Sequence, residues 1–440
     1  MTFSKTVLFA STALGLSLTA ALADGNTATT DQDGNGNSAF VNQDRGADSS
    51  PGGGIDQTAT IDQDGDDNET DVIQDGDSNT TDVMQAGHSN RSDNTSTGAR
   101  NTVTVDQGPE TVWFWNWGWV SQLVGGDDNE SDVTVAGDDN DVDVTQIRDD
   151  NDSDVDVEGD DNDVDVTQDD SFLGDGNTST VEILGDENEV TVDQDGANAS
   201  MATIAGARNE ALIDQSGFNN SSNLTIDGSL GGNDNYVTVD QKSLALGNTL
   251  TAGITGDDNT LDIDQDGNNT ATVGITGDYN DVSIDQFGNN TADVQLNGGV
   301  SGSLESDNNR ISVDQSGGVF GQNSVTVSLW GDDNNRGSAG NNRDGVFSGE
   351  AMTVAGLDGQ IAPGNLTQVG SRNAVTLNVG EPGAESDNNL FSVLQDGTDN
   401  TVTGVVRGGS GNEVAVSQIG SGHDTTFTQV GNANNLGVSQ

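Results

Sequence analysis

The sequence predicts an all-β fold, a β-solenoid of about 15–17 two-strand rungs stacked with cross-β-like spacing. Three observations predict it: Gln and Asn recur at fixed spacing, apolar residues alternate before each Gln, and 60 Gly punctuate the chain against only 4 Pro. The 440 residues are only 30% hydrophobic and 4% aromatic, too few for two or three ordinary globular cores. Stacked rungs need less apolar surface because each rung covers the next.

The first 23 residues predict a secretory signal peptide. Lys5 gives a short positive region, residues 7–18 form an apolar run, and Ala21-Leu22-Ala23 is a small-x-small cleavage signal. The apolar run is too short to span a bilayer. We therefore expect a mature chain that begins at Asp24 and is exported by way of this cleaved segment.

Residues 24–110 and 365–440 are expected to form the N-terminal and C-terminal repeats. Their spacing is Gln-x4-Asn-x5-Gln, seen at Gln63, Asn68 and Gln74 and continued by Asn79 and Gln85. The pattern also opens the mature chain and holds to its last residue, Gln440. Each half of this unit predicts one strand followed by a turn in which Gly and Asn supply left-handed backbone conformations.

Residues 126–335 repeat in a second order, with a unit of about 22 residues made of two unlike halves. The residue six places after each turn Asn is alternately Gln and an aliphatic residue, as in Gln265, Ile275 and Gln286. Gln shares strand parity with the preceding Val and Ile, so we expect it inside, where identical Gln in adjacent rungs satisfy its amide. The predicted ladder residues are Gln32, Asn37, Gln43, Gln63, Asn68, Gln74, Asn79, Gln85, Gln146, Gln168, Gln194, Gln215, Gln241, Gln265, Gln286, Gln315, Gln395, Gln418, Gln429 and Gln440.

Two segments interrupt the repeat. Residues 111–125 are a Trp-rich insertion, and a single strand there would place Trp113, Trp115, Trp117 and Trp119 on one side. That segment is either a glycan-binding or adhesive patch or a ribbon that covers an apolar face. Residues 336–364, which include Pro363, lose the register and are expected to be an irregular loop.

The Gln-x4-Asn-x5-Gln spacing, with Gly in the turn and alternating aliphatics before Gln, resembles the curlin repeat of bacterial curli subunits. The resemblance covers nearly all of the mature chain and is best at 29–107 and 365–440. It implies a secreted subunit that forms extracellular functional amyloid fibres for cell adhesion and biofilm matrix. It further implies that the chain polymerises with itself, with a minor nucleator subunit and an outer-membrane secretion pore as partners.

Composition excludes several other functions. Asp and Glu outnumber Lys and Arg by 74 to 12, for a net charge of -62, so nucleic acid is expected to be repelled, and no later stretch predicts membrane insertion. With no Cys and two His, the chain lacks thiol nucleophiles and the usual zinc ligands. We expect no enzyme, no catalytic residue, no cofactor and no discrete metal site, but diffuse Ca²⁺ binding by the acidic turns.

Two functions remain open at this point. The first is the self-assembling curli-like fibre, which the unbroken repeat at the C-terminus favours because a solenoid that stays monomeric needs capped ends. The alternative is a non-fibrous acidic solenoid that binds calcium or glycan at the cell surface. Both place the protein outside the cell.

Overall fold

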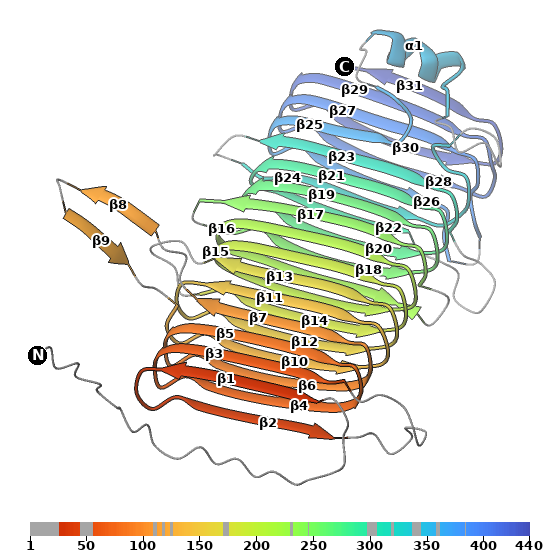
Figure 1. Cartoon of the computed structure of the whole chain (residues 1–440). Helices are drawn as coiled ribbons and strands as arrows, with labels where there is room; N and C mark the ends of the chain where they lie inside the picture. Colours follow the sequence, from red (N-terminus) through yellow and green to blue (C-terminus); the bar gives the residue numbers. More distant parts are fainter. Residues whose placement is uncertain are drawn as a thin grey trace, which may run out of the picture. The chain divides into compact units, whose positions relative to one another are not determined.

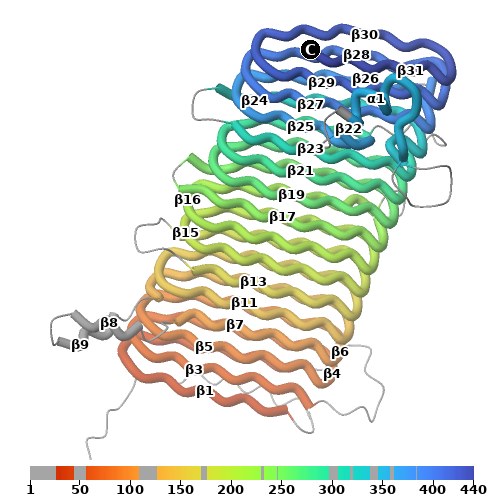
Figure 2. The backbone as a smooth tube through the Cα atoms, turned by 90° about the horizontal axis from the view of Figure 1, so that it is seen from above, coloured from red at the N-terminus to blue at the C-terminus, as the bar shows by residue number. Residues whose placement is uncertain are grey.

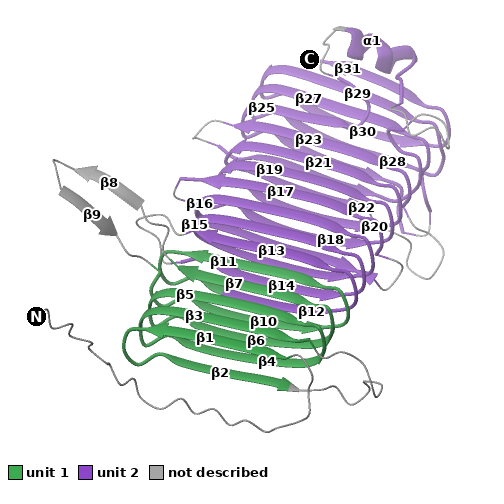
Figure 3. Cartoon of the chain, in the orientation of Figure 1, with its two compact units in different colours: residues 1–152 green, residues 153–440 purple. Residues whose placement is uncertain are grey.

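A computed structural model describes residues 26–44, 56–108, 112–116, 119–123, 126–169, 176–228, 232–244, 246–296, 306–317, 321–336, 345–357, 361–382 and 384–440. The chain divides into two compact units, residues 1–152 and 153–440 (Figure 3). About 68% of the described residues are in strands, and the strands form a β-solenoid of about 14 turns in which stacked strands run parallel. The expected signal peptide lies outside the described residues.

Unit 1 builds each rung from two strands (Figure 1). Its solenoid strands are β1 (Thr27–Asp33), β2 (Ser38–Asp44), β3 (Thr58–Asp66), β4 (Glu69–Asp77), β5 (Thr80–His88), β6 (Arg91–Ala99), β7 (Thr102–Gly108), β10 (Glu130–Ala136) and β11 (Asp141–Ile147). Parallel pairing joins β1, β3, β5, β7 and β11 into one sheet and β2, β4, β6 and β10 into another.

Unit 2 repeats the same arrangement, and its coil can be followed turn by turn from β13 to β30 (Figure 2). Its strands are β12 (Asp152–Glu158), β13 (Asp163–Asp169), β14 (Thr178–Leu184), β15 (Glu189–Ala205), β16 (Glu210–Asp227), β17 (Tyr236–Ser243), β18 (Thr249–Thr255), β19 (Thr260–Gly267), β20 (Thr270–Thr276), β21 (Asp281–Gly288), β22 (Asn290–Leu296), β23 (Arg310–Gly317), β24 (Asn323–Leu329), β25 (Asn365–Ser371), β26 (Ala374–Val379), β27 (Leu390–Thr398), β28 (Thr401–Arg407), β29 (Glu413–Ser421), β30 (Asp424–Val430) and β31 (Asn435–Ser439).

The alternation between Gln and aliphatic residues corresponds to the two sheets. One sheet of unit 2 contains β13, β15, β16, β17 and each later odd-numbered strand up to β31. Each of these strands that extends as far as the last inner position carries Gln there. We call this sheet the glutamine sheet. The opposite sheet, from β14 to β30, carries Ile, Leu or Val at the matching position up to β28, and we call it the aliphatic sheet. The two faces of the solenoid are therefore chemically different.

The core lies between the two sheets. Inner side chains such as Val237, Val239 and Ile254 are completely or almost completely buried, while their neighbours in sequence face solvent, as the period-2 pattern predicts. The structure has about 14 turns, close to the 15–17 rungs that the repeat predicts.

Gly and left-handed Asp shape the turns between strands. Gly267 has φ +124°, and a Cβ there would lie 2.3 Å from the carbonyl oxygen of Gly288 in the next rung. Only Gly permits this close approach. Asp258, just before the turn Asn259, has φ 57° in the left-handed region that Asp and Asn tolerate best.

The described residues of the Trp-rich insertion form two strands rather than one. They are β8 (Val112–Asn116) and β9 (Trp119–Leu123), which pair antiparallel with Trp115 opposite Val120. Trp113 and Trp115 are therefore on one strand and Trp119 on the other, since the Asn-x-Gly sequence between them permits a chain reversal. Trp117 lies outside the described residues.

The segment expected to be an irregular loop contains helix α1 (Gly349–Leu357). The helix packs on the outer surface of β29 and β31 (Figure 1), and its Ala351 and Val354 are buried with Phe347. Outward-facing Leu390, Leu394 and Ala415 complete this cluster, at strand positions that elsewhere carry polar residues. Tertiary packing thus stabilises a short helix whose own sequence shows no helical periodicity. Within the described residues, no helix is long and apolar enough to cross a membrane.

Candidate functional site

The glutamine sheet contains a continuous amide ladder in each unit. In unit 2, the Nε2 of each inner Gln donates to the Oε1 of the Gln in the next rung toward the C-terminus, at 2.7–3.1 Å. The members are Gln168, Gln194, Gln215, Gln241, Gln265, Gln286, Gln315, Gln368, Gln395, Gln418 and Gln440. In unit 1 the ladder joins Gln32, Gln63, Gln85, Gln107 and Gln146.

The ladder satisfies every hydrogen-bonding group of a buried amide. Gln85 is fully buried; its Oε1 accepts from Gln63 at 2.8 Å, and its Nε2 donates to Gln107 at 2.8 Å and to the carbonyl oxygen of Glu69 at 3.0 Å. An amide offers two N–H donors and an acceptor oxygen, so Gln meets this geometry while neither Glu nor Leu can. All the amide dipoles point the same way, which gives the ladder a direction.

At the inner positions of the opposite sheets, the described strands carry Gln only in β2, β4 and β30. Gln43 donates to Gln74 at 2.9 Å in the first rungs of unit 1, and Gln429 takes the equivalent inner position in β30. Gln429 is 6% exposed, donates to the carbonyl oxygen of Glu413 at 3.1 Å, and has no partner for its Oε1. One rung before Gln429, the inner position is occupied by Val406, whose side chain cannot donate a hydrogen bond to this Oε1 atom.

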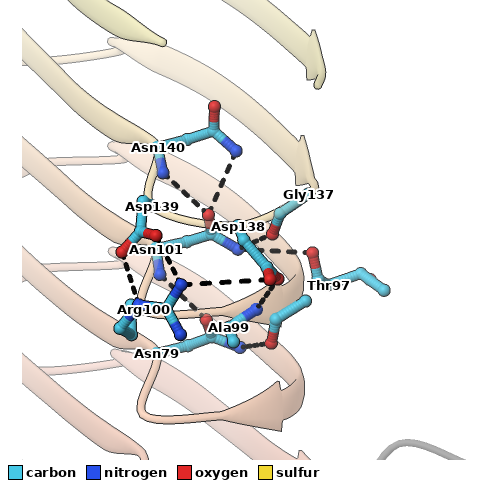
Figure 4. Close-up of polar contacts among 10 residues, drawn as sticks. Asn79, Thr97, Ala99, Arg100, Asn101, Gly137, Asp138, Asp139 and Asn140 are labelled. Carbon is cyan, nitrogen blue, oxygen red and sulfur yellow. Dashed lines mark hydrogen bonds and ion pairs between the residues drawn. The ribbon is translucent and has the colours of Figure 1, made fainter. Parts of the chain in front are cut away.

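Turn Asn residues form a second kind of ladder, shown for unit 1 in Figure 4. The Oδ1 of Asn101 accepts from the backbone N–H of Asn140 at 3.0 Å, and its Nδ2 donates to the carbonyl oxygen of Gly137 at 2.7 Å. Asn79 accepts in the same way from the backbone N–H of Asn101. Asn37 and Asn68 hold equivalent positions in the other column of turns. Each Asn therefore ties its turn to the next rung.

Two members of the glutamine ladder, Gln107 and Gln368, are not among the predicted ladder residues. Gln107 follows the turn residue Asn101 by six places and could have been found by the rule that found the others. Gln368 has no Asn six places before it, because its rung begins just after helix α1; only the later spacing to Asn373 marks it. Gln57 takes the place of a turn Asn and bonds with Asn26.

The outer surface of the glutamine sheet carries a column of aspartates. Residues directly before the ladder Gln stack in register over six rungs of unit 2: Asp193, Asp214, Asp240, Asp264, Asp285 and Asp314. Partial burial, and then repulsion from Asp240 and Asp285, raise the pKa of Asp264. Burial likewise raises the pKa of Asp193, Asp214, Asp285 and Asp314. Lys242, paired with Asp240, is a cation beside this column.

A second acidic column lies in the turns of unit 2. The carboxylate oxygens of Asp278, Asp307, Asp332 and Asp387 each accept a backbone N–H from the turn one rung below. Burial raises the pKa of Asp332 to about 6, although the hydrogen bond from the Asp307 backbone N–H opposes the rise; the charges of Asp307, Asp387 and Glu385 add to it. Among the described residues, Asp332, Glu385 and Asp387 have carboxylate oxygens within 4.8 Å of one another, close enough to contact a single cation.

These raised pKa values predict that moderate acid stabilises the fold. An acid whose pKa is higher in the folded than in the unfolded state binds protons on folding, so its ionisation costs stability as pH rises through the folded value. Unfolded Asp titrates near about 3.9, so the gain should accrue between about pH 7 and about pH 4. Carboxylates whose pKa is lowered, such as Asp139 beside Arg100, stop stabilising the folded state only at still lower pH. We expect the melting temperature to rise from about pH 7.5 to about pH 5.

The variant Asp332→Asn provides the control for this pH effect. It should melt higher than wild type at about pH 7.5 and respond less to acid, because it removes a carboxylate with a strongly raised pKa. Raising NaCl from about 0.01 M to about 1 M at neutral pH should reproduce part of the rise in melting temperature, because salt screens the repulsion between carboxylates. A melting temperature that falls steadily between about pH 7 and about pH 5 would contradict the role of these columns.

Comparison with known families matches two segments of the sequence to one repeat. Residues 137–169 and 256–288 match the curlin-associated repeat. The chain carries curlin repeats. Each matched segment contains two consecutive ladder residues, Gln146 and Gln168 in the first and Gln265 and Gln286 in the second. The matches lie in the alternating region rather than in 29–107 or 365–440, where the sequence resemblance looked best. No curated protein matches the chain.

The curlin repeat suggests a curli-like subunit and an extracellular location. The second matched segment supplies two ladder residues and also two members of the outer acidic column, Asp264 and Asp285, because adjacent residues of one strand face opposite sides of the sheet. The features that remain for function are therefore the open ends of the two sheets and the outer surface.

Proposed function

We propose that this curlin-repeat chain is a secreted structural protein whose copies stack end to end into curli-like extracellular amyloid fibres for cell adhesion and biofilm matrix. Its partner is then another copy of itself, with a minor nucleator subunit and an outer-membrane secretion pore as further partners and with no enzymatic activity. The observation that carries the proposal is that both sheets end in strands whose outer edges pair with no other described strand.

The two ends are complementary. At the N-terminal end, β1 and β2 pair with no described strands other than β3 and β4, so Gln32 and Gln43 offer their Oε1 atoms as acceptors. At the C-terminal end, β30 and β31 pair only with β28 and β29, and the Nε2 groups of Gln429 and Gln440 have no Gln beyond them. Strand edges with free N–H and C=O groups add further strands readily. Donors at one end and acceptors at the other favour head-to-tail stacking.

In such a stack, Gln440 of one copy would donate to Gln32 of the next, and Gln429 would donate to Gln43. Both sheets would then continue through the junction, and the inner face of β1, which is exposed in the single chain, would be covered. On the opposite side, the junction would add Gln429 to the Gln43–Gln74 pair of the first rungs. That placement favours this junction, because Gln would then meet Gln on both sides of the solenoid.

A charge introduced inside the junction should stop assembly without unfolding the chain. Ala28 and Thr29 are both exposed in β1, but Ala28 has the inward parity, opposite buried Ala59. For Ala28→Asp we expect a melting temperature close to wild type and fibre growth at least about tenfold slower, because docking would bury an unpaired carboxylate. Thioflavin fluorescence and electron microscopy of the mature chain measure the effect.

Thr29→Asp is the matched control, since its side chain points outward from the solenoid whether or not another copy docks. It should assemble at nearly the wild-type rate in salt. Equal fibre kinetics for the two variants would show that β1 is not part of the junction.

The second candidate function is a non-fibrous acidic solenoid at the cell surface, and the acidic columns favour it. Stacked carboxylates in two columns provide hard oxygen ligands for diffuse Ca²⁺ binding. The same ions would also reduce repulsion between docking copies, so calcium separates the two functions by its effect on particle size. Light scattering that increases with calcium supports the fibre; calcium binding by chains that stay monomeric supports the alternative.

A further inference from the structure

The outer surface of the aliphatic sheet in unit 2 contains a groove of about 460 Å³. It spans four consecutive strands, β22, β24, β26 and β28, whose outward residues Gln295, Ser328, Asn378 and Val405 are in register. The rest of the lining is Trp330, Gly380, Glu381, Pro382 and Arg407. None of these residues belongs to the ladders or the acidic columns.

The strand register shows why a hollow forms here. Gly380 lies one rung beyond Trp330 and one rung before Arg407, so the position between the two large side chains carries no side chain of its own. Gly380 has φ +73°, and a Cβ there would come within 2.1 Å of the Trp330 carbonyl oxygen. The chain then makes a small extra turn in which Glu381 and Ala384 exchange backbone hydrogen bonds at 3.0 and 2.8 Å. This turn places Glu381 and Pro382 along the groove.

The charge of the groove differs from that of the chain as a whole. Its lining has one negative and one positive residue, Glu381 and Arg407, which pair at 3.7 Å between Oε2 and Nη1. The remaining lining residues are amides, a hydroxyl, an indole and apolar groups. Because the chain has a net charge of -62, a polyanion would be repelled over a long range. A polycation would find no unpaired carboxylate in the groove, since Glu381 is paired with Arg407. The groove therefore suits an uncharged ligand with many hydrogen-bonding groups.

We propose that this groove binds a neutral glycan chain. The partly exposed Trp330 offers an aromatic surface to the apolar C–H face of a sugar ring, because indole combines a large apolar body with a polar edge. Exposed Gln295 and Asn378, each able to donate and accept, are placed to bind sugar hydroxyl groups on neighbouring rungs. The Arg407 and Glu381 pair supplies further donors and acceptors beside Gly380. This proposal does not depend on fibre formation.

Affinity electrophoresis of the mature full-length chain through gels that contain a polysaccharide tests the proposal. The probes are a mixed-linkage β-glucan and a galactomannan, both neutral, and alginate, which is anionic. We expect the neutral polysaccharides to retard the wild-type chain and alginate to leave it unaffected. Trp330→Ala should weaken binding at least about tenfold, which corresponds to about 1.4 kcal/mol. Asn378→Ala, a change at an exposed side chain, should weaken it severalfold with no change in melting temperature.

Two control variants locate the site. Tyr279→Ala removes an exposed aromatic residue of unit 2 outside the groove and should bind as wild type does. A variant with Trp113, Trp115, Trp117 and Trp119 all changed to Ala should also keep its binding. The proposal is overturned if Trp330→Ala and Asn378→Ala bind normally, if only the four-Trp variant loses binding, if alginate alone retards the chain, or if no polysaccharide does.

Discussion

Gln265→Glu is expected to destabilise unit 2 by about 3–5 kcal/mol at neutral pH. Gln265 is fully buried, accepts from Gln241 at 2.8 Å, and donates to Gln286 at 2.8 Å and to the carbonyl oxygen of Thr249 at 3.5 Å. A carboxylate keeps only the accepting role, so it would face two acceptors while buried and charged. Thermal or urea unfolding followed by circular dichroism measures the loss.

Two controls separate burial from charge for Gln265→Glu. Asp264→Asn, one residue away on the outer face, removes a carboxylate from the acidic column and should be neutral or mildly stabilising. Gln295→Glu makes the same chemical change at an exposed amide that donates to Asp293 at 3.0 Å, and it should cost no more than about 1 kcal/mol. Acid should partly rescue Gln265→Glu, because burial raises the pKa of the new carboxyl and its neutral form can donate one hydrogen bond. Similar melting for all three variants would contradict the assignment of Gln265 to the interior.

Gly267→Ala is expected to cost about 2–5 kcal/mol, from backbone strain together with overpacking. The new Cβ would lie 2.3 Å from the Gly288 carbonyl oxygen at φ +124°, so the rungs would have to separate or the turn would have to change. Gly274, in β20 of the same unit, is the matched position because a Cβ there meets nothing within 4 Å and its φ is not positive.

Gly274→Ala should be neutral or stabilising by up to about 1 kcal/mol, since Ala restricts the unfolded chain more than Gly does. Melting temperatures of the two variants, compared with wild type under one buffer condition, measure the difference. A loss for Gly274→Ala as large as that for Gly267→Ala would show that Gly content in general, rather than stacking of the turns, limits stability.

The repeat could be predicted from the sequence because its signals are local and regular. Period-2 burial, Gln at the parity of Val and Ile, and Gly-x-x-Asn turns all fall within one half-rung, and the β-solenoid fold that they predict is confirmed. The sequence also contained the alternation of Gln with aliphatic residues, but only the strand pairing reveals that it separates two chemically different sheets.

Features that depend on distant residues could not be predicted in the same way. Helix α1 is stabilised because it buries the outward-facing Leu390 and Leu394. These residues come more than thirty positions after the helix in the chain. The run Leu390-Phe391-Ser392-Val393-Leu394 breaks the usual polar outer pattern and is the signal that marks such a covered face. The groove beside Gly380 likewise combines four strands, so no single repeat contains its pattern.

Fibre diffraction from the purified mature chain, assembled in salt near neutral pH, tests the central claim most directly. The account predicts fibres whose axis is the stacking direction of the rungs, with a meridional reflection at about 4.8 Å, and fibre growth that Ala28→Asp blocks. Chains that stay monomeric in salt and calcium, or fibres that lack the reflection along their axis, would contradict end-to-end stacking of the solenoid.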